Sequence, residues 1–292
     1  MISLAALERA LSSERLAGYR LVDDRNETDG LARYLWNMAL ANAIQPALQT
    51  LEISFRNEIA RAAARITTGR NYTVDRIPSW LDAQPTMLLP HEREKVERAK
   101  AELGSDPRSQ TEGHLIAKLD FGFWVALCRD SYNDLRGEGP RLWDRALSLV
   151  CRKRPADITT RAQIFHRFNR IRVFRNRVAH HEPIWDRQYL SEHEYILESL
   201  GWMHPKLADA VRTMSPAEPV FRAGFSAYLP HAQTLLGTGS GIREMLSTKL
   251  NGLDHDQRIL VADLVKALTS NGDADPVHVV RRWADELYSE AA

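Results

Sequence analysis

Apolar residues recur at intervals of three and four between Leu31 and about Ile66, the spacing that places them on one face of an α-helix. Pro46 lies inside this segment and is expected to break or kink it near Gln45, giving one bent helix or two in sequence. The chain shows no series of alternating β-branched segments and no internal repeat. The predicted fold class is therefore all-α. The apolar positions of this first segment are Leu35, Met38, Ile44, Leu48, Leu51, Phe55 and Ile59.

Two further segments follow an irregular connector. Residues 67–89 carry clustered polar residues and prolines, so they are expected to form that connector, with Trp80 as its anchor. A charged helix is expected over residues 90–104, and a mostly apolar helix over residues 114–135 that is central to the core. The buried face of the apolar helix is predicted to consist of Leu115, Leu119, Phe123 and Leu127.

Another long helix is expected to begin after a cap at Asp157 or Thr159 and to run to about His181. Because Pro183 disfavours helical geometry at Glu182, the chain should leave this helix directly after two adjacent histidines. The carbonyl end of a helix favours a protonated imidazole, so this position suits a histidine that exchanges protons.

The C-terminal part of the chain suggests a division into two regions. Ser191 is expected to cap a helix over residues 192–202. The stretch GTGSG at residues 237–241 has the composition of a flexible linker. The predicted organisation is a helical domain over residues 1–236 and an additional C-terminal helical region over residues 237–292.

The composition excludes several classes of protein. With 44% hydrophobic and 26% charged residues and no apolar run long enough for a bilayer, the chain reads as soluble, with no membrane partner. Its first apolar stretch is too short and too charged for a secretory signal, so a cytoplasmic location is expected. Cys128 and Cys151 form no CxxC pair and indicate neither a disulfide framework nor a zinc cluster. A net charge of +1 still permits a local basic patch.

An arginine interrupts the apolar stripe of the long helix. At about 100° per residue, position 175 falls inside the stripe that is expected to face the core, yet it carries Arg175. A buried guanidinium is costly unless it is paired or opens into a polar cleft, so this placement points to a site. Arg172, Asn176 and His180 follow one another at intervals of four on the adjoining flank. The apolar members of the stripe are Ile164, Phe168, Ile171 and Val178.

A guanidinium, an amide and a titratable imidazole together suit cleavage of RNA. A histidine can accept a proton from the ribose 2′-hydroxyl or donate one to the leaving oxygen, and an arginine can stabilise the charge that grows on the phosphate. The predicted products are a 2′,3′-cyclic phosphate and a 5′-hydroxyl, and the reaction needs neither metal nor cofactor. A metal site formed by His180, His181 and Glu182 is disfavoured, because adjacent helical side chains diverge by about 100°.

The same residues carry a resemblance to known proteins. RNRVAH, from Arg175 to His180, is similar to the R-x4-6-H signature of the HEPN superfamily. Three blocks in order, LEISFRNEI (51–59), LDFGFWVAL (119–127) and FRNRVAHHEPIW (174–185), resemble the Abi-like family of bacterial abortive-infection proteins. The resemblance covers about residues 1–210 and does not extend to residues 237–292.

This resemblance implies a HEPN-like helical bundle, usually a homodimer, in which two motifs face each other to form a composite ribonuclease site without a metal. Arg175 and His180 are then the catalytic pair, and Asn176 positions the phosphate or the histidine. His181 could assist or replace His180, and which of the two moves the proton is open. The implied role is antiviral defence or toxicity, with RNA as substrate and an antitoxin or other neutralising protein as a further partner.

Residues outside the signature are expected to support it. Glu52 and Arg56 have the spacing of an ion pair within a helix, and Glu52 is hypothesised to contact Arg175. Arg172 and Arg177 are candidate contacts to the RNA backbone, although such arginines can equally form a solvated face.

Two other classes of function fit the same residues. The first is a non-catalytic module whose pocket binds a nucleotide, RNA or a protein partner, since a fold or motif does not by itself establish catalysis. The second is a purely structural helical interaction protein, in which Arg175 and His180 belong to a buried polar network. Kinase and phosphate-loop interpretations of DFGFW and GTGSG fail because the accompanying motifs are missing.

Overall fold

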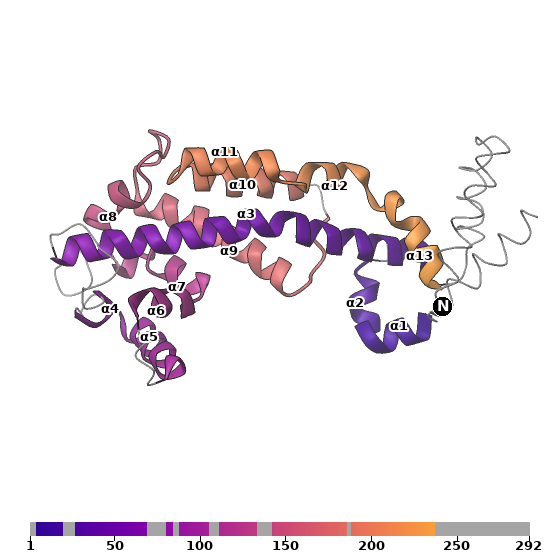
Figure 1. The fold of residues 1–292 in the computed structure, drawn as a ribbon, viewed down its shortest axis with the longest axis horizontal. Coiled ribbons are helices and arrows are strands. Elements are labelled where there is room, and N and C mark those ends of the chain that lie inside the picture. The colour runs from indigo at the N-terminus through magenta and orange to yellow at the C-terminus, as the bar shows by residue number, and fades with distance from the viewer. Residues whose placement is uncertain are drawn as a thin grey trace, which may run out of the picture. The chain divides into compact units, whose positions relative to one another are not determined.

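The computed structural model of the chain describes residues 4–19, 27–68, 80–83, 88–104, 111–132, 142–185 and 188–236. These residues form helices and turns without a β-strand, so the fold is all-α as predicted (Figure 1). The predicted linker at residues 237–241 and the C-terminal region that follows it lie outside the described residues.

The elements follow one another in the order α1 (Leu4–Leu11), α2 (Ser13–Ala17), α3 (Glu27–Thr68), α4 (Trp80–Ala83), α5 (Pro90–Leu103), α6 (Glu112–Lys118), α7 (Phe121–Ala126), η2 (Asp130–Tyr132), α8 (Trp143–Val150), α9 (Arg161–Ala179), α10 (Tyr189–Gly201), α11 (Pro205–Met214), α12 (Ala217–Ala223), η3 (Phe225–Tyr228) and α13 (Leu229–Leu236).

Contacts divide the chain into two compact units. One is formed by the described residues between 36 and 223 and contains every candidate site residue; the other combines the described residues between 4 and 35 with residues 224–236. In the second unit, Leu31 and Ala32 of α3 pack with Ala232 of α13.

Helix α3 continues through Pro46, so of the two expected alternatives the segment forms one helix rather than two. Proline removes one backbone donor, which leaves the carbonyl of Asn42 without its helical partner. Asn42, Gln45 and Pro46 are all exposed, so water can replace that bond and the helix continues.

The apolar segment expected to be one helix over residues 114–135 is divided into α6 and α7. The side chain of Asp120 accepts a hydrogen bond from the backbone N–H of Phe123 at 2.5 Å, which starts a new helix. The division does not expose the predicted face, because its members Leu115, Leu119, Phe123 and Leu127 are all buried.

Helix caps differ from the predicted ones by a residue or more. Thr160, rather than Asp157 or Thr159, caps α9 and forms a capping box with Gln163. Helix α10 begins at Tyr189, ahead of the expected cap Ser191, and its first position has no side-chain cap. Trp80 is buried, as its expected anchoring role requires.

An aromatic junction joins α3, α7 and α9. The ring of Phe55 stacks on Phe168 with 3.7 Å between ring centroids and 10° between planes. Phe121 meets Phe55 edge to face at 6.1 Å. Buried aromatic rings remove a large apolar area from water, and the edge-to-face contact of Phe121 with Phe55 adds to that stabilisation.

Helix α10 lies along both α9 and α11 (Figure 1). Arg167 of α9 stacks on the rings of Tyr195 and Trp202, and Arg170 pairs with the buried Glu192 at 2.7 Å. Tyr189 fastens α10 to α3 because its hydroxyl donates to the carbonyl of Leu40 at 2.9 Å.

Cys128 and Cys151 are both buried. Burial raises the pKa of the Cys151 thiol to about 12, as suits small core residues.

None of the helices in the described residues has the length and apolar character needed to cross a bilayer.

Candidate active site

The last turn of α9 presents two imidazoles at the surface. The helix ends at Ala179, and the backbone N–H of His180 donates to the carbonyl of Asn176 at 2.8 Å. His180 and His181 are both exposed. The chain thus leaves the helix at the histidine pair, as expected from Pro183.

His181 occupies a left-handed backbone position. Its φ angle is 57°, and its backbone N–H donates to the carbonyl of Val178 at 3.1 Å. The backbone N–H of Glu182 donates to the backbone carbonyl of Arg177 at 2.9 Å. These two bonds form a Schellman motif, in which glycine is the usual residue at the left-handed position. A histidine there adds backbone strain, which is characteristic of residues kept for their side chains at functional sites.

Asn37 of α3 fixes the turn that follows the histidines. Its side-chain amide donates to the carbonyl of Glu182 at 3.2 Å, and its Oδ1 accepts the N–H of Ile184 at 2.7 Å. Asn37 is itself 3% exposed, and its bond to Ile184 is buried, whereas its bond to Glu182 is partly buried. The sequence interpretation missed this residue, although an asparagine beside buried Trp36 in an apolar helix was a signal for it.

Arg175 and Glu52 are brought together, as hypothesised. The Nε atom of Arg175 lies 3.4 Å from an Oε atom of Glu52, and their side chains are 40% and 22% exposed. The carboxylate restricts the orientations of the guanidinium while leaving part of it accessible to a ligand.

The expectation that Arg175 faces the core was wrong. Phe174 is buried at this turn, whereas Arg175 reaches the edge of the interface. A helical wheel gives the direction of Cβ, but a long arginine side chain can bury its stem and carry its charged end to the surface. The other stripe members, Ile164, Phe168, Ile171 and Val178, are buried as predicted.

Asn176 and Arg56 lie on the two helices that carry the Arg175 and Glu52 pair. Asn176 is partly exposed, one position beyond Arg175 on α9. Arg56 is also partly exposed, and its Nε atom is buried without a hydrogen-bond partner. In this described part of α3 there is no ion pair between Arg56 and Glu52, whose carboxylate faces α9 instead.

The arginines considered for RNA contact have several partners within the protein. Arg177 donates to the carbonyl of Pro183 and lies 3.8 Å from Glu182, so it braces the turn after α9. Arg172 donates to the side chain of Asn169 at 3.0 Å and runs beside Gly122 of α7. Arg172 therefore stays a candidate contact to an RNA backbone, whereas Arg177 holds the turn after α9.

The assembled groups can perform proton transfer and charge stabilisation. Exposed imidazoles at a helix C-terminus can exchange protons, and a partly exposed guanidinium held by a carboxylate can receive a phosphate. Across the described residues, no group of three His, Cys, Asp or Glu side chains is placed to hold a metal ion.

Comparison with protein-family models gave no match for this chain, and comparisons with curated proteins and with solved structures gave none either.

Replacement of Asn37 by alanine should destabilise the protein. It leaves the buried N–H of Ile184 unpaired, which costs about 1–3 kcal/mol in the free energy of unfolding measured by urea denaturation. Met38→Ala is the matched control, because the neighbouring Met38 is 54% exposed. Equal stability of Asn37→Ala and Met38→Ala would show that the hydrogen bonds of Asn37 contribute nothing to the stability of the fold.

Replacement of His181 by glycine should relieve the backbone strain, because glycine adopts a φ of 57° without it. His181→Ala should be less stable than His181→Gly by about 1 kcal/mol in denaturation. At His180, where φ is −88°, glycine should bring no such advantage over alanine. Equal stability of the His181→Ala and His181→Gly variants would contradict backbone strain at position 181.

Proposed function

We propose that this chain is an endoribonuclease that cleaves RNA without a metal ion. The observation that carries the proposal is the accessible Arg175, oriented by Glu52, on the helix that ends in the exposed His180 and His181. The similarity of RNRVAH to the HEPN signature adds support from the sequence.

In the proposed reaction, His180 or His181 accepts the proton of a ribose 2′-hydroxyl, and the 2′-oxygen attacks the adjacent phosphorus. Arg175 stabilises the negative charge on the phosphorane. The bond from phosphorus to the 5′-oxygen then breaks, and a protonated imidazole donates its proton to that oxygen. The products are a 2′,3′-cyclic phosphate and a 5′-hydroxyl.

Glu52 acts in this scheme as a positioning residue. Its carboxylate limits the orientations of the Arg175 side chain, so the guanidinium need not be ordered when the substrate binds. Asn37 and the Schellman turn hold the backbone of the histidine pair in the same way.

A second copy of the chain would provide the second proton-transfer group. The proposed homodimer places two histidine pairs around one phosphate, so that one imidazole acts as base and another as acid. In a cell, such an activity suits phage defence or a toxin that a partner protein neutralises.

The purified chain is expected to cleave single-stranded RNA in the presence of EDTA. Arg175→Ala, and His180→Ala combined with His181→Ala, should each lower kcat/KM by at least about 100-fold, because they remove charge stabilisation and proton transfer. End-labelled RNA separated on denaturing gels measures this. His166→Ala is the matched control, because His166 is an exposed histidine on the same helix.

Undiminished cleavage by the double histidine variant would contradict the mechanism. Equilibrium binding of RNA without any product, even at high protein concentration, would favour the alternative of a non-catalytic binding module.

A further inference from the structure

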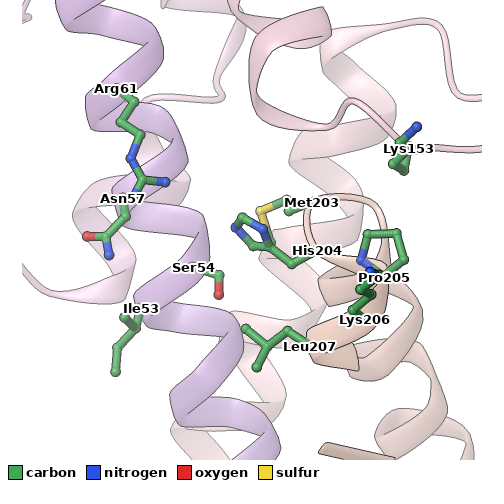
Figure 2. Close-up of a pocket in the computed structure, with 10 residues that line it drawn as sticks. All are labelled: Ile53, Ser54, Asn57, Arg61, Lys153, Met203, His204, Pro205, Lys206 and Leu207. Carbon is green, nitrogen blue, oxygen red and sulfur yellow. The ribbon is translucent and has the colours of Figure 1, made fainter. Parts of the chain in front are cut away.

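A cleft with apolar and cationic lining residues lies between α3, the turn after α8 and the corner between α10 and α11. Its volume is about 620 Å³, within the range of small-molecule sites. The backbone N–H of Lys153 donates to the carbonyl of Trp202 at 2.8 Å, which joins two of these segments. The lining residues are Ile53, Ser54, Asn57, Arg61, Lys153, Met203, His204, Pro205, Lys206 and Leu207 (Figure 2).

This cleft is separate from the candidate active site. At about 100° per residue, Glu52 and Arg56 fall on one flank of the buried stripe of α3, and Ser54 and Arg61 fall on the other. Phe55 lies on the stripe between them, stacked on Phe168.

A buried carboxylate organises the cationic side of the cleft. The side chain of Glu58 is 7% exposed, and its Oε1 accepts a hydrogen bond from the Arg61 guanidinium at 2.5 Å. The same oxygen lies 3.3 Å from Nε2 of His204. Arg152 approaches the same carboxylate at 3.7 Å. Glu58 therefore fixes Arg61 and His204, whose side chains are 49% and 37% exposed and remain accessible to a ligand.

Positive charge exceeds negative charge around the cleft. Among the described residues that line the cleft or pair with its lining, Lys153, Lys206, Arg61 and Arg152 are cationic, and Glu58 is the carboxylate. Helix α11 also begins here, with His204 at its cap position and Pro205 in its first turn. The positive end of that helix dipole adds to the attraction for an anion.

Apolar side chains line another part of the same cleft. Ile53 and Leu207 are 44% and 41% exposed, and Met203 lies beside His204 (Figure 2). Large exposed aliphatic side chains next to cationic ones fit a ligand with an apolar body and an anionic group.

We propose that this cleft binds a small phosphate ester. Arg61, Lys153 and Lys206 supply the positive charge that attracts the phosphate, and Ile53, Met203 and Leu207 contact the attached apolar body. A phosphate suits several lysine and arginine groups because it carries close to two charges and three acceptor oxygens. The inference does not depend on ribonuclease activity.

Calorimetric titration of the full chain with phenyl phosphate, inorganic phosphate and phenol tests the proposal. Phenyl phosphate has no 2′-hydroxyl and cannot be cleaved by the proposed reaction. We expect it to bind about 10-fold more tightly than inorganic phosphate, because its ring loses contact with water. Ile53→Ala combined with Leu207→Ala should reduce the difference in affinity between phenyl phosphate and inorganic phosphate.

Lys153→Glu combined with Lys206→Glu should weaken phenyl phosphate binding by at least about 10-fold. Arg93→Glu with Arg129→Glu makes the same change of charge at exposed positions outside the cleft and should leave binding unchanged. Circular dichroism verifies that both double variants keep their helices. His180→Ala with His181→Ala should also leave this binding unchanged, which separates the two proposals.

Absence of phenyl phosphate binding would overturn the proposal, as would equal binding by the lysine variant and the natural chain. Binding of single-stranded RNA that depends on Lys153 and Lys206, without any binding of phenyl phosphate, would also overturn the proposal. The surface would then be a binding site for the RNA backbone.

Discussion

The stacking of Phe55 on Phe168 sets the register between α3 and α9, on which the candidate site depends. The two helices run in opposite directions, because later residues of α3 meet earlier residues of α9. From this junction, Glu52 reaches Arg175 and, further along, Asn37 reaches the turn after the histidines. A shift of one residue in this packing would separate both pairs of partners. Phe121 of α7 contacts Phe55 edge to face at the same junction.

Helical periodicity predicted the all-α fold and most of the buried stripes, because burial of an apolar face is a local property of a helix. It failed at Asp120, whose side-chain cap starts α7 inside a continuous apolar pattern. At Pro46 it left one bent helix or two open, because the sequence pattern did not reveal that the freed carbonyl lies on the exposed side of α3. Both points concern single hydrogen bonds rather than hydrophobic patterning.

For the site, the sequence predicted the histidines at the helix end and the contact between Glu52 and Arg175. It misplaced Arg175 in the core, because the wheel ignores the length of a side chain. It missed Asn37 and Glu58, whose partners come from distant parts of the chain that no local spacing identifies. The left-handed backbone at His181 was also beyond sequence reasoning, since that position usually holds glycine.

The central claim is that an RNA 2′-hydroxyl is the nucleophile at a site built from Arg175 and the histidine pair. The most direct measurement maps a cleavage position in one RNA and then replaces the nucleotide on its 5′ side by the 2′-deoxy form. The account predicts a 2′,3′-cyclic phosphate from the natural RNA and no cleavage at the deoxy position. Continued cleavage at that bond would contradict it.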